Sequence, residues 1–464
     1  MRILVINISL RPYLREKLFP IGLGYITTAM KNAGYKFDLL DIDAHRFSDK
    51  EVEDYIAAHQ YDIVCMGCIV TGYKIIKSLS SLIKQYNPET KIVVGNSVAT
   101  SITEILLTRA KVDIAVMGEG DETIIDLLKT ISQGKSLKDV KGIYFNKDGK
   151  IYRTPDRHPI SDISGLPLIE FSIFDVDLYI RNSKNYVGDP LPIPRDDVRA
   201  LPVNIARGCI ANCGFCYHVF KGVPYRYRSP DSITKEIRML IDKYSLNYIC
   251  FWDELTFFSK KQAVELIQKI IDEDLHFYWT GHCRANLFND DEDISIIEKM
   301  KEAGCVGMTY SLESADPAIL KAMNKHITVD QFSKQTRLFH KARLTVWTSL
   351  VIGYPQETPQ TIKKTFDFCI ENRIYPSSGY LLPQPASPMY VYAKEKGFIK
   401  DEEQYLMSMG DRQDLRINMT SMSDSELTDC VLKGLAKCNK ELKMGLKEGQ
   451  LIKTQHFRAK DLNE

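Results

Sequence analysis

Short apolar runs alternate with helix-length segments along most of this chain, and this pattern constrains the fold more than any other feature. Five runs lie in the first part, at residues 2–8, 37–42, 61–67, 91–95 and 112–118. Buried parallel strands have this length and composition, and the segments between them can form the helices that return over the sheet. The first part is therefore predicted to be a doubly wound, Rossmann-like domain that binds ligands at the carboxyl ends of its strands.

The alternation restarts after a hairpin and a proline-rich stretch. The hairpin is predicted at 142–152, with Asp148 and Gly149 at its turn. Six further apolar runs follow, at residues 203–207, 248–253, 277–282, 307–312, 346–353 and 379–382. Six parallel strands with helices between them are predicted to form a partial (β/α)6, TIM-like barrel, whose active site lies at the carboxyl ends of the strands.

These patterns divide the chain of 464 residues into four predicted parts. The Rossmann-like domain covers residues 1–135, and the hairpin with the proline-rich linker covers 136–198. The barrel covers 199–395, and a helical C-terminal extension covers 396–464. The fold class is therefore α/β throughout, apart from this extension.

Three cysteines occur together directly after the first predicted barrel strand, at Cys209, Cys213 and Cys216. Their spacing is C-x3-C-x2-C. An iron–sulfur cluster normally takes four cysteines. Three thiolates can hold three corners of a four-iron cluster, and the fourth iron then has no nearby protein ligand. A small molecule can bind there.

Two other interpretations of the triplet are a zinc site and unconnected buried thiols. Zinc is often bound by three cysteines and one histidine, but His218 follows Cys216 too closely to complete a tetrahedron easily. Unconnected buried thiols would not explain why Gly208 and Gly214 frame the loop, where the backbone must wrap tightly. The sequence therefore favours an iron–sulfur cluster.

The cysteine loop, including the aromatic Phe215 before the last cysteine, resembles that of the radical SAM superfamily. In this family the loop holds a 4Fe–4S cluster, and the open iron binds the amino and carboxylate groups of S-adenosylmethionine. One electron then cleaves the sulfonium to methionine and a 5′-deoxyadenosyl radical. The resemblance therefore implies S-adenosylmethionine as a cofactor and a reductant such as flavodoxin or ferredoxin.

The resemblance also implies contacts to S-adenosylmethionine at the ends of the second and third barrel strands. Asp253 and Glu254 stand where the family places groups that accept hydrogen bonds from the methionine ammonium, and one of the two can be purely structural. Arg284 stands where it could pair with the methionine carboxylate or with an acidic group of the substrate.

At the fourth and fifth strands the implied contacts are to the nucleoside. Ser311 and Glu313 resemble the residues that hold the ribose, since a carboxylate accepts hydrogen bonds from both hydroxyls. Gly353 lies in a segment that resembles the one flanking adenine through backbone groups. Each of these residues alone is more often a surface group, but together they occur in the expected order along the chain.

Residues 1–135 resemble the cobalamin-binding domain that precedes many radical SAM barrels, on the elements at 20–25 and 118–123. The implied corrin contacts are Gly22, Cys68, Gly95, Asn96 and Gly118. The loop at 9–19 lacks the histidine that ligates cobalt in the methionine-synthase type, and His45 is interpreted as a surface residue. Cobalamin is therefore expected without a protein ligand to cobalt, and the alternative is a relic domain that has lost the corrin.

The composition excludes some functional classes. The net charge is +1 with no long basic block, so we expect neither a nucleic-acid nor a membrane partner. There is no run of 18 apolar residues and no signal peptide. Eleven cysteines without an export signal indicate reduced thiols and a cytoplasmic protein.

The leading hypothesis is a cobalamin-dependent radical SAM enzyme. It would abstract hydrogen from a small-molecule substrate and transfer a methyl group from methylcobalamin to carbon. A first alternative is a radical SAM dehydratase, epimerase or rearrangement enzyme with a vestigial cobalamin domain. A second is a non-catalytic iron–sulfur protein. No side chain is assigned as a catalytic acid or base.

Overall fold

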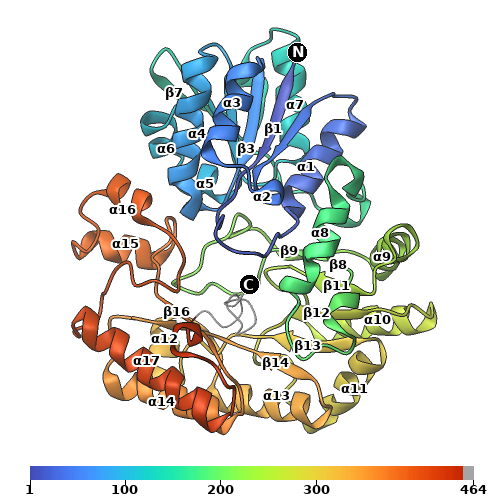
Figure 1. Ribbon diagram of the computed structural model, residues 1–464, viewed down its shortest axis with the longest axis vertical. Coiled ribbons are helices and arrows are strands. Elements are labelled where there is room, and N and C mark those ends of the chain that lie inside the picture. The colour runs from blue at the N-terminus through green and yellow to red at the C-terminus, as the bar shows by residue number, and fades with distance from the viewer. Residues whose placement is uncertain (453–464) are drawn as a thin grey trace.

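The first α/β unit is built on a seven-stranded sheet, seen at the top of Figure 1 in a computed structural model that describes residues 1–452. The strand order is β2-β1-β3-β4-β5-β6-β7, with the first five strands parallel and the last two antiparallel. The strands are β1 (Ile3–Asn7), β2 (Asp38–Asp41), β3 (Ile63–Gly67), β4 (Lys91–Gly95), β5 (Ile114–Val116), β6 (Ile143–Lys147) and β7 (Lys150–Arg153). The helices are α1 (Ile21–Asn32), α2 (Ile42–His45), α3 (Asp49–Ala58), α4 (Tyr73–Tyr86), α5 (Asn96–Ser101), α6 (Thr103–Arg109) and α7 (Asp121–Ser132).

Alternate side chains of these strands enter two separate hydrophobic cores, as expected for a sheet covered on both faces. Leu4 and Ile6 pack with α3, α4 and α6, whereas Val5 packs with α1 and α7 on the other face. Cys65 and Cys68 are both buried, one in each core, which agrees with their interpretation as small hydrophobic residues. The doubly wound architecture predicted from the sequence is confirmed.

The hairpin and the linker connect the first unit to the second. Asp148 and Gly149 at the tip of the β6–β7 hairpin both have positive φ, as a two-residue turn of this kind requires. The linker includes α8 (Val176–Asn182), and its Tyr179 donates a hydrogen bond to Asp41 in the first unit at 2.7 Å. The Ser183 hydroxyl accepts a hydrogen bond from the backbone N–H of Ala200, at the start of the second unit. The linker therefore contacts both units.

The second unit contains five parallel strands in the order β14-β13-β12-β11-β8 and a parallel pair, β15-β16. These strands are β8 (Ala200–Val203), β11 (Tyr248–Phe251), β12 (Tyr278–His282), β13 (Cys305–Thr309), β14 (Thr345–Trp347), β15 (Ser349–Ile352) and β16 (Ser377–Tyr380). The helices are α9 (Pro230–Tyr244), α10 (Lys260–Asp272), α11 (Ile294–Glu302), α12 (Pro317–Ala322), α13 (Val329–Lys341) and α14 (Pro359–Glu371). The partial barrel predicted from the sequence is confirmed.

Two predicted barrel strands differ from those observed. The predicted strand 203–207 is divided, because β8 ends at Val203 and residues 206–207 form β9, which pairs with β10 (Arg226–Tyr227) outside the barrel sheet. The predicted strand 346–353 is interrupted at Thr348, whose hydroxyl accepts the N–H of Leu312. In the second case a hydrogen bond to another strand end replaces continuous pairing.

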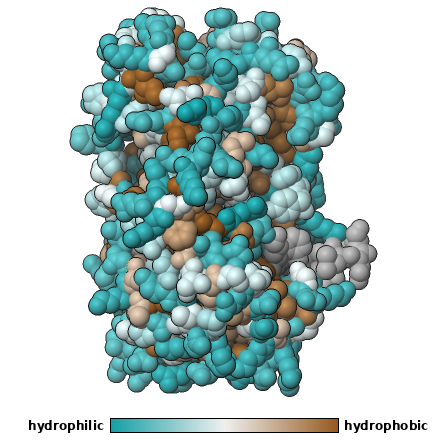
Figure 2. All heavy atoms as spheres, turned by 90° about the vertical axis from the view of Figure 1, so that its left-hand side faces the viewer, coloured by the Kyte–Doolittle hydropathy of each residue, from teal (hydrophilic) through white to brown (hydrophobic). Residues whose placement is uncertain are grey.

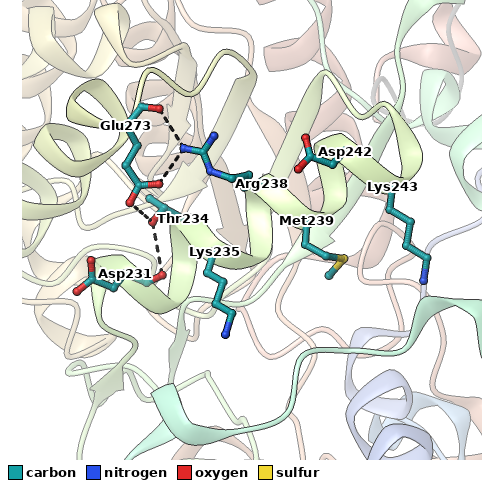
Figure 3. A pocket seen from close by; sticks show the side chains of 8 residues that line it. All are labelled: Asp231, Thr234, Lys235, Arg238, Met239, Asp242, Lys243 and Glu273. Atoms are coloured by element: carbon teal, nitrogen blue, oxygen red, sulfur yellow. Dashed lines mark hydrogen bonds and ion pairs between the residues drawn. The ribbon is translucent and has the colours of Figure 1, made fainter.

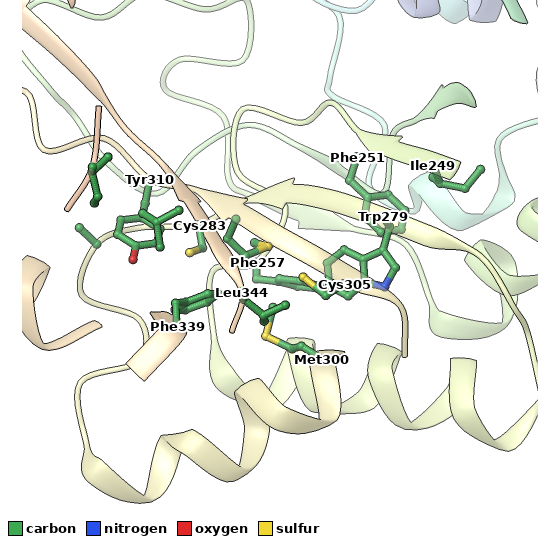
Figure 4. Close-up of a cluster of buried hydrophobic side chains, with 14 of the residues drawn as sticks. Ile249, Phe251, Phe257, Trp279, Cys283, Met300, Cys305, Tyr310, Phe339 and Leu344 are labelled. Atoms are coloured by element: carbon green, nitrogen blue, oxygen red, sulfur yellow. The ribbon is translucent and has the colours of Figure 1, made fainter. Parts of the chain in front are cut away.

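Large side chains fill the space between the barrel strands and their covering helices (Figure 4). Trp279 of β12 is completely buried and donates its indole N–H to the Ala303 carbonyl at 2.7 Å. Met300 of α11 and Phe339 of α13 pack beneath the same strands. This core fixes the strands whose carboxyl ends carry the predicted site residues.

The C-terminal extension contacts both units. It follows α15 (Pro388–Glu395) and contains α16 (Glu402–Ser408), which packs on α4, and α17 (Asp424–Glu441), which packs on α14. Ser423 caps α17 by accepting the N–H of Glu426. Residues 453–464 of the predicted extension lie outside the described residues.

The face that carries α15 and α16 is mainly hydrophilic, with hydrophobic side chains in small separate groups (Figure 2). Among the helices of residues 1–452, none has the length and apolar character needed to cross a membrane.

Candidate functional site

The three cysteines lie in the loop between β9 and β10, at the carboxyl side of the barrel. Cys213 is buried, and Cys209 and Cys216 are half-buried. Backbone hydrogen bonds hold this loop, from Gly214 N–H to the Met323 carbonyl (2.8 Å) and from Met389 N–H to the Gly214 carbonyl (3.0 Å). The loop is thus fixed by the residue that follows α12 and by the first turn of α15.

The three thiols are close enough to influence one another. Burial, followed by the charges of Cys213 and Cys209, raises the pKa of Cys216 to about 12. Within residues 1–452 no three His, Cys, Asp or Glu side chains already converge as a ligand set. Binding a cluster would therefore draw the sulfurs together and release their protons, because the ligand is the thiolate.

Asp253 and Glu254, the adjacent carboxylates after β11, have different environments. Asp253 is buried, and its Oδ1 accepts the backbone N–H groups of Ile205 (2.9 Å) and Ala206 (3.0 Å) and the Asn204 amide. Burial raises its pKa to about 7. These bonds bend the chain from β8 into β9 and lead it to the cysteine loop. Asp253 therefore holds the backbone through Oδ1, and its Oδ2 is buried without a hydrogen-bond partner among the described residues.

Glu254 is exposed and faces the cysteine loop. The N–H of Gly208, the residue before Cys209, donates to its carboxylate at 3.4 Å. Its charge also acts on His218, whose pKa is lowered by burial and raised by Glu254. Glu254 is therefore the exposed carboxylate of the pair.

This difference predicts that substitution of Asp253 mainly lowers stability, whereas substitution of Glu254 mainly weakens ligand binding. Asp253→Ala removes the acceptor for two buried backbone N–H groups and is expected to cost about 3 kcal/mol of stability together with cluster retention. Glu254→Ala is expected to change stability by less than about 0.5 kcal/mol and to weaken S-adenosylmethionine binding about tenfold. Urea unfolding and equilibrium dialysis measure the two quantities. Equal stability losses in both variants would contradict the assignment.

Glu313, after β13, has one carboxylate oxygen free for a ligand. It is buried, and its Oε1 accepts Lys325 Nζ at 2.8 Å. Its Oε2 is buried and has no hydrogen-bond partner within the described part of the chain. A buried acceptor without a partner is costly, so this oxygen fits a ligand donor such as a ribose hydroxyl. The pairing with Lys325 was not visible in the sequence.

The other residues predicted to hold S-adenosylmethionine surround this group. Arg284 donates to the carbonyls of Lys325 (2.7 Å) and His326 (3.0 Å), so it supports the lysine that pairs with Glu313. Ser311 shares a 2.7 Å hydrogen bond with Ser349 of β15. Arg284 therefore acts on Glu313 through Lys325 rather than by direct contact.

Two residues predicted to contact S-adenosylmethionine make contacts within the protein instead. Gly353 has φ +107°, which favours glycine, and its N–H donates to the buried carboxylate of Glu357. Burial raises the pKa of Glu357 to about 7. The Gly353 N–H is therefore not available to adenine. Phe215 packs, partly buried, against the core that contains Tyr354.

The residues predicted to contact the corrin lie at the carboxyl ends of the first sheet. A Cβ added at Gly22, Gly95 or Gly118 would meet no atom within 4 Å, so the backbone is open to a ligand at all three positions. Asn96 has φ +68°. Cys68, by contrast, is buried beneath Gly72, where an added Cβ would lie 2.6 Å from its sulfur. The Cys68 side chain therefore packs inside the domain.

Buried ion pairs join the two units beside the cysteine loop. Arg207 of β9 binds Glu119 (2.5 Å) and Asp121 (3.0 Å), and Arg226 of β10 binds the other oxygen of Glu119 (2.8 Å). All four side chains are at most 11% exposed. We call these four residues the interdomain clamp. The segment 118–123 belongs to the predicted cobalamin-binding domain, but the sequence does not predict its arginine partners, which lie 86 to 107 residues away.

Two cavities differ in their relation to this site. A pocket of about 610 Å³ opens on the outer surface of the barrel (Figure 3), and all of its lining residues except Glu273 belong to α9. It is remote from the strand ends. A smaller cavity of about 90 Å³ lies between the units and is lined by Gly118 and Glu119 on one side and by Val219 and Phe220 of the cysteine loop on the other. Only the smaller cavity touches the clamp.

Comparison with protein families matches two parts of the chain. Residues 203–369 match the radical SAM superfamily, and residues 13–128 match the B12 binding domain. The chain contains a radical SAM domain preceded by a B12-binding domain. The prediction of the family, and of a 4Fe–4S cluster, S-adenosylmethionine and cobalamin as its cofactors, is confirmed.

Several known proteins resemble this chain. An uncharacterized methyltransferase of Pyrococcus horikoshii is 26% identical over 81% of this chain and 78% of its own. The anaerobic magnesium-protoporphyrin IX monomethyl ester cyclase of Rubrivivax gelatinosus is 26% identical over 83% of this chain and 68% of its own. The structure of TsrM, a radical S-adenosylmethionine methyltransferase from Kitasatospora setae, superposes with a TM-score of 0.67 at 18% identity, covering 85% of this chain and 76% of TsrM.

Proposed function

We propose that this chain is a cobalamin-dependent radical SAM enzyme that methylates a carbon atom of a small molecule. The observation that carries the proposal is the interdomain clamp, which joins the Gly118 end of the B12-binding sheet to the base of the cysteine loop. Several relatives are methyltransferases, which supports methyl transfer; they include two bacteriochlorophyllide d methyltransferases of Chlorobaculum tepidum.

The chain's own residues bind and orient in this proposal. Cys209, Cys213 and Cys216 would hold the cluster, Glu254 would accept the methionine ammonium, and the free oxygen of Glu313 would accept a ribose hydroxyl. When bound, the cluster, S-adenosylmethionine and cobalamin would supply an electron, a hydrogen-abstracting radical and a methyl group. The clamp would keep the two cofactor sites in a fixed relation.

A second candidate is radical chemistry without methyl transfer. The magnesium-protoporphyrin cyclase and the methyltransferase of Pyrococcus horikoshii have the same sequence identity to this chain, 26%. In both candidates we propose that the reductant is a flavodoxin or a ferredoxin and that the enzyme works in the cytoplasm, where its eleven unpaired thiols stay reduced.

The test is anaerobic reconstitution of the full chain with iron and sulfide, followed by dithionite and S-adenosylmethionine. We expect 5′-deoxyadenosine and a corrin spectrum that survives gel filtration with added cobalamin. No deoxyadenosine would contradict both candidates. Deoxyadenosine without corrin retention would contradict the methyltransferase and leave the second candidate.

The open backbone at Gly95 gives a prediction about the corrin. A Gly95→Ile side chain would project into the space above the sheet, where no atom of the chain lies within 4 Å of its Cβ. It is expected to weaken cobalamin binding at least about tenfold with little loss of stability. Gly165→Ile, at a linker glycine, is the control. Equal cobalamin binding by both variants, titrated by absorbance, would contradict the assignment.

A further inference from the structure

A short segment of the C-terminal extension lies between the two units at the mouth of the barrel. The backbone carbonyl of Arg412 accepts the N–H of Tyr380, at the end of β16, at 2.7 Å. The neighbouring Asp411 pairs at 3.4 Å with Arg11, in the loop after β1 of the B12-binding domain. Residues 411 and 412 are therefore tied to both units.

The Arg412 side chain lies on the inner surface of the barrel. Tyr380 packs outward with Leu427 and Val431 of α17, so the preceding residue, Gly379, faces the opposite side of the strand. A Cβ added at Gly379 would lie 2.6 Å from Nη1 of Arg412 and 3.0 Å from its Cζ. The guanidinium therefore lies against the one residue of β16 that has no side chain.

Within residues 1–452, no carboxylate lies close enough to this guanidinium to form an ion pair with it. It donates hydrogen bonds to the Leu350 carbonyl (3.2 Å) and to the Ser377 hydroxyl (3.4 Å). The nearest acids are engaged, Glu313 by Lys325 and Asp411 by Arg11. Both arginines of the interdomain clamp, in contrast, form ion pairs with acids.

The surroundings of Arg412 favour an anionic ligand. Burial lowers the pKa of Arg412, and the charge of Glu313 raises it, which places the guanidinium near the residue proposed to hold the ribose. Arginine has five N–H donors, and only two hydrogen bonds are made here. Arg412 is half-buried, so its other donors are open to a ligand, and a planar guanidinium is suited to bind the two oxygens of an oxyanion.

We propose that Arg412 binds an oxyanion of the substrate, a carboxylate or a phosphate-type group, between the barrel mouth and the loop after β1. This inference rests on the proposed function, because it names the substrate class of the same site. It makes Arg412 a specificity-determining residue that the family motifs do not include. S-adenosylmethionine also carries a carboxylate, so the test must separate the two sources.

The probe is inorganic phosphate, titrated into the reconstituted full chain and followed by the phosphorus NMR linewidth. We expect phosphate to bind with S-adenosylmethionine present or absent, and Arg412→Gln to weaken binding about tenfold or more. Gly379→Ala keeps the charge but its Cβ must displace the guanidinium, so it should also weaken binding. Arg238→Gln, an exposed arginine of α9, is the control and should bind as the wild type does.

Wild-type affinity in Arg412→Gln, or no binding to the wild type, would overturn the inference. Displacement of phosphate by S-adenosylmethionine would overturn it too, because the anion site would then belong to the methionine carboxylate. Phosphate binding requires no turnover. A protein that binds phosphate through Arg412 and makes no 5′-deoxyadenosine would therefore contradict the proposed function and leave the anion site standing.

Discussion

Replacing Arg207 with methionine is expected to destabilise the protein by about 3 to 5 kcal/mol, the cost of leaving a buried charge without its partner. Asp121 would lose its two bonds to Arg207, and Glu119 would keep Arg226 and the backbone N–H of Ile160. These carboxylates would stay buried in the variant, so the cost of removing them from water would remain while the attraction to Arg207 is lost. The change is measured as the shift of the urea unfolding midpoint.

A matched control separates this effect from loss of an arginine in general. Arg153→Met removes an exposed pair with Asp156, whose side chains are 59% and 73% exposed, and should cost no more than about 1 kcal/mol. Arg207→Met combined with Asp121→Asn should recover part of the loss, because the unpaired charge is also removed. A loss in Arg207→Met as small as in the control would show that the clamp does not hold the two units together.

Cys213→Ala is expected to abolish cluster binding and, with it, the cleavage of S-adenosylmethionine. Three thiolates are the minimum that leaves one iron open, so a variant with two cannot hold the cluster in the same way. Iron and sulfide content after reconstitution and 5′-deoxyadenosine formation are the measurements. The expected loss is complete, which makes this the largest effect on activity.

Cys283→Ala is the control for this variant. Cys283 is buried at the end of β12, where its sulfur accepts from Gln335, and it lies outside the cysteine loop. Its replacement should cost about 1 kcal/mol of packing and leave the iron content unchanged. A full four-iron cluster in Cys213→Ala would contradict the ligand assignment.

The fold was largely predictable because most of its strands coincide with short apolar runs that can be recognised in the local sequence. Residues 91–95 are β4 as predicted, and the other apolar runs overlap the observed strands. The exceptions depend on distant groups. The run at 203–207 is bent by the carboxylate of Asp253, and the run at 346–353 is broken where Thr348 bonds to Leu312. Local periodicity contains no information about such contacts.

The site was predictable where the family motif specifies a residue, as for the cysteine loop and the carboxylates at strand ends. It was not predictable where two similar residues differ only in burial. Asp253 and Glu254 are adjacent and chemically alike, but one holds the backbone and the other faces the loop. The pairing of Lys325 with Glu313 and the free guanidinium of Arg412 likewise depend on tertiary packing.

The packing of α16 on α4 also determines the order in which the chain can complete its fold during synthesis. Glu403 of α16 bonds with Tyr73 and Lys77 of α4, partners 330 and 326 residues earlier. The B12-binding domain leaves the ribosome long before α16 exists, and pairings over such separations form late. The surface of α4 that α16 covers must therefore stay exposed until the barrel has been made.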